Sequence, residues 1–358
     1  MYAAGDSSAR SGMAEKWIVR KGSKSEGFSY AGPDGKGVRA KDKLDRIDLL
    51  RIPPAWRDVH IAANPRAAIQ VWGLDARGRK QYRYHSRAVQ KGELRKYYRV
   101  RQMARALPVL RKRFDEDFNQ RGYTQERVCA AIMLLISDSF FRVGSERYER
   151  ENSTFGLTTL KKSHVTIKGD RLIFDYVGKR NIRQKQVVTE TGMAELTSAA
   201  MAEFIRALRK TPGERLFRYR KNGEWMNADA SDVNDYLQGI AGFPYTAKDF
   251  RTWGGTLRTA TVLADIGSAP SKTARNRNVV TAVRLVASEL GNTPTIVRKS
   301  YVHPVVISRY LKSGETIVVP HRPEAKRSGR AALLPEERAL VKFLDKHFPE
   351  RRGERRDN

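Results

Sequence analysis

The stretch LGNTPTIVRKSYVHP, residues 290–304, places a tyrosine near the end of a short predicted helix. Thr293 followed by Pro294 is a typical helix start, because threonine caps free backbone N–H groups and proline fits the first helical position. About two turns later the chain reaches Tyr301, whose hydroxyl is the candidate reactive group of this stretch.

The surroundings of Tyr301 indicate what its hydroxyl could do. Arg298 and Lys299 precede it closely, and the amide of Asn292 lies nine residues earlier. A phenol is a weak nucleophile with a pKa of about 10. Cations favour its attack on a phosphodiester, because the charge to be stabilised there is negative. The alternative is that Tyr301 is an ordinary half-buried helix tyrosine.

The composition restricts the class of partner. The chain has 358 residues, 40% of them hydrophobic, which is enough for two domains with real cores. Its formal charge of +30 calls for a polyanionic partner. Nucleic acid is the first candidate and an anionic membrane surface is the rival. No long amphipathic stretch has a purely basic polar face, and no run of 18 apolar residues could span a bilayer.

Cysteine and histidine usage argues against a metal centre or a disulfide framework. Cys129 is the single cysteine and lies in the apolar run 128–136, so it is expected in the core. The six histidines show no ligand-like spacing, and no metal is expected. The first residues contain no apolar signal region, so we expect an intracellular, cytoplasmic protein.

Periodicity divides the chain into a tail, two domains and a second tail. Residues 1–16 are predicted to be disordered and 17–90 to form a small β-rich domain. Residues 91–320 are predicted to form a larger, mainly helical domain, followed by a basic tail, 321–358, with one helix at 335–348. The expected fold class is therefore α+β.

Strands and helices are predicted at the following places. In the β-rich domain the strands cover 17–19, 59–62, 68–72 and 80–85, with a loop at 75–79. In the larger domain three strands cover 164–167, 172–177 and 183–188, and the helices cover 94–114, 193–208, 274–290 and two stretches opened by Thr124 and Thr246. The helix opened by Thr124 is apolar on nearly all sides, so it should be buried and should end near Gly144.

Three cations occupy positions that suit anion binding. Arg142 follows the apolar helix, where it could cap carbonyls, pair with a carboxylate or bind an anion. Arg251, with Lys248 nearby, lies in the first turn of the Thr246 helix, where bound anions are favoured; an ion pair with Asp249 or another acid is the alternative. Lys179 stands at the tip of a predicted hairpin, where a solvated lysine is the alternative.

Several stretches together resemble one family. RIPPAW at 51–56, DARGRKQYRYH at 75–85 and ENSTFGLTTL at 151–160 are similar to bacterial and poxvirus-like type IB DNA topoisomerases. With the segments around the three cations and residues 290–304, the resemblance extends from about residue 27 to 310. Tyrosine recombinases resemble the chain more loosely, because they share the Arg/Lys/Arg/Tyr set but lack the N-terminal stretches.

The resemblance implies a role for each residue. Tyr301 matches the nucleophile, Arg142 and Arg251 the two arginines that contact phosphate, and Lys179 the general acid. Asn292 stands where poxvirus-like members and recombinases have histidine, whereas the bacterial branch resembles this chain in having asparagine there. An amide there can donate to phosphate but has no titratable group, so no acid–base role is expected for it.

The resemblance also implies an activity, a partner and a shape. A monomer would clamp duplex DNA in the nucleoid, relax supercoils through a 3′-phosphotyrosine, and use no cofactor, metal or ATP. The sequence agrees, since it has neither a phosphate-binding Gly-rich Lys-Ser/Thr loop nor a clustered Asp pair for Mg²⁺.

Contacts between the β-rich domain and DNA are implied for Gln81, Tyr82 and Tyr84. Strand alternation puts the two tyrosines on one face and Gln81 on the other. The alternative is that the tyrosines pack in the core of the β-rich domain. For the whole chain, two further hypotheses are a tyrosine site-specific recombinase and a non-enzymatic, basic DNA-compaction protein; the latter explains the charge but not the spacing of the candidate catalytic residues.

Overall fold

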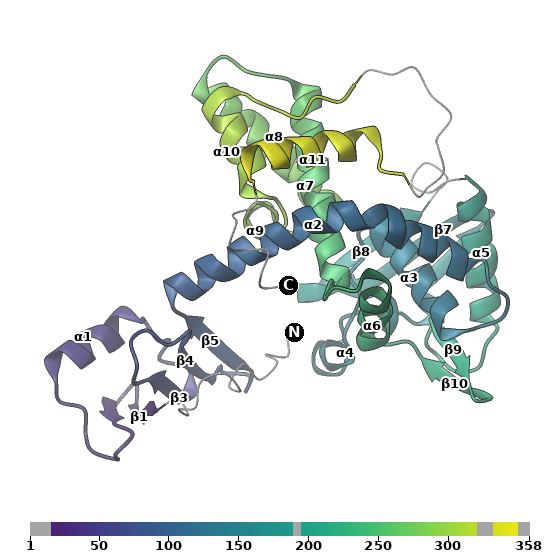
Figure 1. The fold of residues 1–358 in the computed structure, drawn as a ribbon. Helices are drawn as coiled ribbons and strands as arrows, with labels where there is room; N and C mark the ends of the chain where they lie inside the picture. Colours follow the sequence, from purple (N-terminus) through teal and green to yellow (C-terminus); the bar gives the residue numbers. More distant parts are fainter. Residues whose placement is uncertain (1–15, 189–194, 321–331, 350–358) are drawn as a thin grey trace. The chain divides into compact units, whose positions relative to one another are not determined.

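The computed structural model describes residues 16–188, 195–320 and 332–349, and these fall into two compact units. The units meet between Lys96 and Tyr97, inside helix α2 (Ser86–Phe118), which is the long helix in Figure 1. The sequence predicted the boundary between the two domains slightly earlier, near residue 90. The predicted tail at 1–16 lies almost wholly outside the described residues, so its disorder stays a prediction.

The first unit is built on one antiparallel sheet. Its strand order is β2-β1-β3-β4-β5, and its elements are β1 (Trp17–Ser23), β2 (Gly27–Ala31), α1 (Lys41–Leu49), β3 (Arg57–Ala62), β4 (Ile69–Leu74) and β5 (Lys80–Tyr84). Ile47 of α1 packs on the inward side chains of the sheet, among them Ile18, Ile61 and Val71. Helix α1 therefore closes a small core on one face of the sheet.

Two elements of this unit were missed by the sequence analysis. β2 carries no clear alternation of apolar residues, and α1 is a short helix among charged residues with no side-chain cap at Ala40. Its three apolar residues are Leu44, Ile47 and Leu49, and Leu49 is exposed, so its helical signal is weak and packing against the sheet stabilises it.

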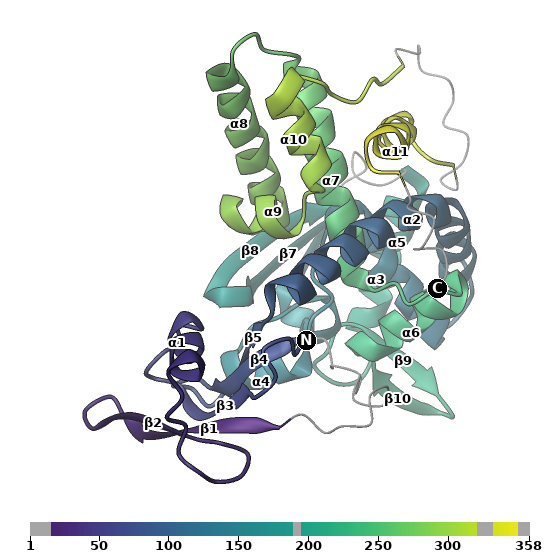
Figure 2. The same ribbon diagram turned by 60° about the vertical axis from the view of Figure 1, so that its left-hand side comes forward.

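The second unit is mainly helical, as predicted. Its helices are α3 (Gln125–Ser139), α4 (Glu146–Asn152), α5 (Glu195–Arg209), α6 (Ala230–Ala241), α7 (Ala247–Ile266), α8 (Lys272–Leu290), α9 (Pro294–Ser300), α10 (Pro304–Ser313) and α11 (Pro335–His347). Helices α6 and α7 pack on α3. Figures 1 and 2 both show α7, α8 and α10 side by side. Residues 128–136 of α3, including Cys129, are completely buried, which confirms that prediction.

Two small sheets complete the second unit. The predicted three-stranded sheet is present as β6 (Val165–Lys168), β7 (Arg171–Gly178) and β8 (Ile182–Val188), and a hairpin adds β9 (Arg218–Lys221) and β10 (Glu224–Asn227). Helix α5 packs on β7. Residue 193, where this helix was predicted to begin, lies outside the described residues.

The end of α3 differs from the prediction. The helix stops at Ser139, and Phe140 takes a left-handed conformation with φ of 55° instead of the predicted stop near Gly144. A non-glycine residue in this region is strained by about 1–3 kcal/mol. The early stop leaves Phe140, Phe141 and Arg142 outside the helix, where the Phe140 ring packs against Gly254 of α7.

Among the described residues, no helix combines the length and apolar character needed to cross a bilayer.

The packing of Gly254 yields a stability prediction. A Cβ at Gly254 would overlap the Phe140 ring, whereas a Cβ at the exposed Gly239 of α6 would meet nothing within 4 Å. Inside a helix, alanine is more favourable than glycine by about 1 kcal/mol, and this applies at both positions. We therefore expect Gly239→Ala to raise the unfolding temperature by about 2–4 °C and Gly254→Ala to lower it, as measured by calorimetry. Equal shifts for both variants would contradict this packing.

Candidate active site

Arg251 is held by the first turn of α7. The helix begins after Thr246, whose backbone N–H donates to Asp249 Oδ2 at 2.9 Å, so the predicted capping pair is present. Asp249 also contacts Arg99 Nε at 3.5 Å. Its carboxylate is therefore engaged by the helix start and by Arg99, and the predicted alternative of an Arg251–Asp249 ion pair is wrong.

The guanidinium of Arg251 is buried and bonded to backbone carbonyls. It is 3% exposed, and it donates to the oxygen of Phe140 and, at 2.9 Å, to that of Leu290. Burial lowers the pKa of Arg251 to about 10, so it remains charged at neutral pH. Its Nε–H has no hydrogen-bond acceptor within the described part of the chain. A buried donor in this state is costly unless a ligand accepts from it.

Arg142 lies against the loop that carries Asn292. Its Nη2 donates to Gly291 O and to Asn292 Oδ1, both at 2.7 Å. Arg142 therefore caps the C-terminal end of α8 rather than the helix that precedes it in sequence. The bond to Oδ1 also fixes the amide of Asn292 with its NH₂ group on the other side.

Asn292 is held immediately after α8. Its backbone N–H donates to Ala287 O at 3.0 Å, and its Nδ2 donates to Leu290 O at 3.3 Å. The preceding Gly291 has φ of 57°, and a Cβ there would overlap the side chain of Gln184. Glycine is thus required at 291 both for the left-handed backbone and for space, and it places Asn292 beside Arg142.

Tyr301 follows the last turn of α9, as predicted, and its backbone N–H donates to Val297 O. Its ring centroid lies 5.3 Å from the guanidinium carbon of Arg251. Burial raises the pKa of Tyr301, but the charge and hydrogen bond of Arg251 and the charge of Arg142 outweigh burial, so the pKa lies below its usual 10.0. The hydroxyl therefore loses its proton more readily than that of an ordinary tyrosine.

Gly255 allows Tyr301 to approach α7. A Cβ at Gly255 would meet Tyr301 O at 2.8 Å and Tyr301 Cβ at 3.2 Å. The sequence analysis did not assign Gly255 a role. The sequence feature that could have indicated this close approach is the pair Gly254–Gly255 inside a predicted helix, because glycine in a helix interior is unfavourable unless close packing requires it.

Lys179 occupies the tip of the hairpin between β7 and β8, as predicted. The turn η4 (Lys179–Asn181) places Arg180 and Asn181 in the left-handed region, with φ of 66° and 59°. Lys179 is exposed as a residue, yet desolvation lowers the pKa of its amine below 10.5, with Tyr301 raising it and Arg142 lowering it. Its Nζ lies 5.7 Å from the Tyr148 ring. Lys179 is thus exposed at the hairpin tip, as the alternative of a solvated lysine expects, and its amine also interacts electrostatically with Tyr301 and Arg142.

Lys248 is exposed on α7, one turn before Arg251, and its charge contributes to the lowered pKa of Tyr301. The second unit thus brings together all five residues predicted as catalytic, and adds Lys248. No group of three or more potential metal-binding His, Cys, Asp or Glu side chains occurs in the parts of the chain that the structure describes.

The three predicted DNA contacts of the first unit lie on β5. Tyr82 and Tyr84 are 41% and 53% exposed and stack with ring centroids 6.0 Å apart. The alternative that they pack in the core is therefore wrong. Gln81 points to the other face, where its Nε2 donates to Asp75 Oδ2 at 2.9 Å. Lys80 lies on the same face of β5 as the two tyrosines, and its Nζ lies 3.8 Å from the centroid of the Trp72 ring.

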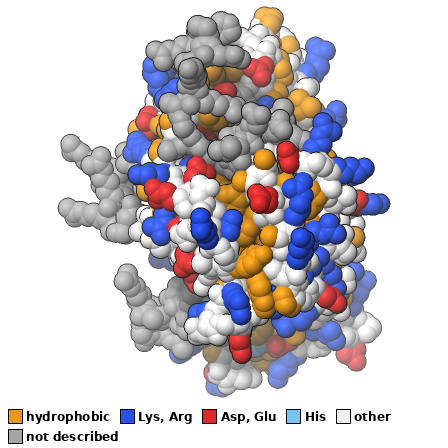
Figure 3. Space-filling model, turned by 90° about the vertical axis from the view of Figure 1, so that its right-hand side faces the viewer, with side chains coloured by type: hydrophobic (Ala, Val, Ile, Leu, Met, Phe, Trp, Pro, Cys, Tyr) orange, Lys and Arg blue, Asp and Glu red, His pale blue; other side chains and the backbone are white. Residues whose placement is uncertain are grey.

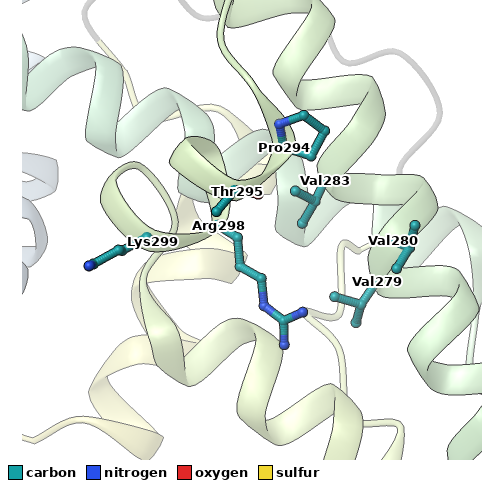
Figure 4. Close-up of a pocket in the computed structure, with 7 residues that line it drawn as sticks. All are labelled: Val279, Val280, Val283, Pro294, Thr295, Arg298 and Lys299. Carbon is teal, nitrogen blue, oxygen red and sulfur yellow. The ribbon is translucent and has the colours of Figure 1, made fainter.

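Two further features concern the surface. Lys and Arg side chains are spread over the face seen in Figure 3, with acidic and hydrophobic side chains between them. A cavity of about 550 Å³ lies between α8 and α9, lined by Val279, Val280, Val283 and Arg298 among others (Figure 4). Arg298 and Lys299, which flank Tyr301 in sequence, line this cavity (Figure 4), and neither is among the residues whose charge shifts the pKa of Tyr301 most.

Comparison with known proteins gives consistent matches. A family model described as the catalytic core of eukaryotic DNA topoisomerase I matches residues 85–318, and one described as the N-terminal domain of bacterial DNA topoisomerase IB matches residues 27–75.

Individual relatives agree with the family models. DNA topoisomerase 1B of Acanthamoeba polyphaga mimivirus is 31% identical over 311 residues, covering 84% of this chain and 89% of the relative. DNA topoisomerase 1B of Vaccinia virus is 26% identical over 243 residues, covering 66% and 70%. DNA topoisomerase 1 beta of Arabidopsis thaliana is 30% identical over 164 residues, covering 45% and 16%. These matches favour neither the recombinase nor the compaction hypothesis. The chain belongs to the type IB DNA topoisomerases.

Proposed function

We propose that this DNA topoisomerase relaxes supercoiled duplex DNA by breaking and rejoining one strand through a phosphotyrosine at Tyr301. The observation that carries the proposal is the position of the Tyr301 ring 5.3 Å from the buried Arg251 guanidinium, together with the lowered pKa of its hydroxyl. A nucleophile of this kind, surrounded by fixed cations, suits attack on a phosphodiester.

In the proposed reaction the Tyr301 hydroxyl gives its proton to water and its oxygen forms a bond to phosphorus, while the bond from phosphorus to the 5′-oxygen breaks. The strand is left joined to the protein as a 3′-phosphotyrosine. Lys179 gives its proton to the leaving 5′-oxygen, and religation reverses each step. One phosphodiester replaces another, so the bond energy is conserved and no ATP is required.

Arg142, Arg251 and Asn292 are proposed to donate to the non-bridging phosphate oxygens. The Nε–H of Arg251 is a buried donor without an acceptor among the described residues, and a phosphate oxygen would satisfy it. Arg142 occupies the oxygen of the Asn292 amide and one N–H of its Nδ2 donates to Leu290 O, which leaves the second N–H of Nδ2 as the donor for phosphate. These donors are in place before DNA binds, which is the arrangement that lowers a barrier most effectively.

Binding of the duplex is proposed to rest on phosphate contacts from the excess of basic residues, with Lys248 near the reacting phosphate. The exposed Tyr82 and Tyr84 are proposed to contact the duplex from the first unit. Gln81 lies on the opposite face of β5, where it bonds Asp75, so its contact with DNA rests on the family resemblance alone. Enclosure of DNA by the two units, a monomeric state and a location at the nucleoid stay predictions.

The first prediction concerns the activity itself. Supercoiled plasmid incubated with the protein in EDTA without ATP should become relaxed, and denaturant should trap a covalent protein–DNA adduct. Tyr301→Phe removes only the attacking oxygen, so it should bind the plasmid with unchanged affinity and give neither product. An adduct formed by the Phe variant would show that another residue attacks.

The second prediction concerns pH and Lys179. Its protonated form is the acid, and its pKa lies below 10.5. Cleavage of an ordinary strand should therefore slow as the pH rises through that pKa. A strand with sulfur at the bridging 5′ position should show no such fall, because a thiolate leaves without a proton.

Lys179→Ala provides the matching variant. It should cleave the oxygen strand slowly at every pH and the sulfur strand at nearly the wild-type rate. Equal defects on both substrates would make Lys179 a phosphate ligand instead of the acid.

The third prediction concerns Arg251. Arg251→Ala should slow single-turnover cleavage and religation by about a hundredfold or more, as for loss of one oxyanion donor. Arg251→Lys should restore little of the lost rate, because lysine lacks the forked donor group of arginine.

Arg275 is the matched control for Arg251. It also holds backbone carbonyls, with bonds of 3.0 Å to Leu311 O and 2.9 Å to Ala269 O, and it is not among the residues that shift the pKa of Tyr301. Arg275→Ala should lower the unfolding temperature and leave cleavage unchanged. A similar loss of cleavage in both variants would mean that Arg251 is only structural.

A further inference from the structure

Helix α11 lies beyond residues 85–318, which the catalytic-core family model matches, yet it is attached to the helices of the active centre. Figures 1 and 2 show it alongside α2 and α7. Its two ends make different contacts, and each leads to a segment that carries a proposed catalytic residue.

The N-terminal end of α11 is fixed by a buried carboxylate. Glu337 is 1% exposed and receives two hydrogen bonds from Arg111 of α2, at 2.7 and 2.8 Å, and one from the Leu334 N–H at 2.9 Å. Trp253 Nε1 donates to it at 3.4 Å. Trp253 stands two residues after Arg251 on α7, so Glu337 joins α11 to the helix of the second arginine. Removing one partner of such a buried pair is strongly destabilising, which makes this end a firm anchor.

The C-terminal end of α11 is fixed by a second set of polar contacts. Arg101 of α2 donates from Nε to Asp345 Oδ1 at 2.6 Å and from Nη1 to Phe348 O at 3.1 Å. Arg309 of α10 donates to His347 Nδ1 at 2.8 Å. These bonds hold the backbone of Phe348, the residue that follows the helix, in one position.

The ring of Phe348 packs on a buried histidine next to the nucleophile. It meets His303 edge-on, with centroids 4.6 Å apart and planes at 79°, and it packs against Tyr98 at 4.5 Å. His303 is completely buried, and Tyr97 packs on it at 4.8 Å. His303 is thus enclosed between a ring of α2 and the ring that α11 supplies.

His303 is joined to the backbone of Tyr301 through Thr256. The His303 N–H donates to Thr256 Oγ1 at 3.0 Å, and this hydroxyl donates to Thr252 O at 2.7 Å and lies 3.3 Å from Tyr301 O. The His303 Nδ1 accepts from the Val305 N–H at 3.2 Å and so begins α10. A continuous set of contacts therefore runs from Phe348 through His303 and Thr256 to Tyr301.

Building on the proposed function, we propose that Phe348 is a positioning residue for Tyr301. Anchored by α11, its ring holds His303 in place and thereby keeps the Tyr301 backbone against α7, facing Arg251. Small displacements of a reacting group lower the rate of a chemical step steeply, whereas they leave the binding surface for the substrate intact. Loss of the ring should consequently slow cleavage without weakening DNA binding.

The test compares Phe348→Leu, Phe348→Tyr and Phe204→Leu in the full-length protein. Leucine keeps an apolar side chain and removes the ring, and Phe348 is partly exposed after the end of α11, so the variant should fold. Tyrosine keeps the ring. Phe204 of α5 is the control, because it is a buried ring of the same unit that packs on Phe118 and Tyr123.

Single-turnover cleavage of a duplex is measured over a range of protein concentrations, below the unfolding temperature of every variant. Phe348→Leu should be about tenfold slower in cleavage and religation at saturation, with an unchanged half-saturating concentration and an unchanged cleavage equilibrium. Phe348→Tyr should react nearly as fast as wild type, and Phe204→Leu should be less stable but equally fast.

Three outcomes would overturn the inference. They are a wild-type rate for Phe348→Leu, an equal slowing in Phe204→Leu, or a change confined to the half-saturating concentration. Each of them presupposes that the wild type cleaves DNA. A wild-type protein that forms no adduct would instead refute the proposed function, so the two failures are distinguishable.

Discussion

The guanidinium of Arg251 connects three segments of the catalytic unit. It donates to Phe140 O just after α3 and to Leu290 O at the end of α8, and its charge lies 5.3 Å from the Tyr301 ring. A buried cation is costly unless it is compensated. Carbonyls at helix C-termini carry partial negative charge and compensate it without a carboxylate. Because no carboxylate in the described segments pairs with Arg251, its positive charge remains available to a phosphate and to the phenol of Tyr301.

Much of the surrounding structure serves this arrangement. The left-handed turn at Phe140 ends α3 early and aims a carbonyl at Arg251, while Gly255 lets the backbone of Tyr301 approach α7. Arg142 and Asn292 hold one another on the neighbouring loop. The site is therefore assembled from the ends of helices, where unsatisfied backbone groups are available, and not from the middle of any one element.

Local signals predicted the pieces of the site but not their contacts. The Thr246–Asp249 pair, the apolar α3 and the hairpin around Lys179 have short-range patterns, and all three are present. The alternation of β5 also predicted that Tyr82 and Tyr84 share a face. Weakly patterned elements such as α1 were missed because packing, and not propensity, stabilises them. Arg251 and the Phe140 carbonyl are 111 residues apart, and such pairings depend on the packing of whole helices. The roles of the site residues came from the family resemblance.

The central claim is that the cations activate Tyr301 before DNA binds, and the ionisation of this one phenol in the free protein tests it most directly. Tyrosines carrying ¹³C at the ring carbon bonded to oxygen would be titrated by NMR in the wild type and in Tyr301→Phe, and the signal absent from the variant belongs to Tyr301. The account predicts that this signal titrates with a pKa below the ordinary value of 10.0. A Tyr301 pKa at or above 10.0 would contradict it, because burial would then outweigh Arg251 and Arg142.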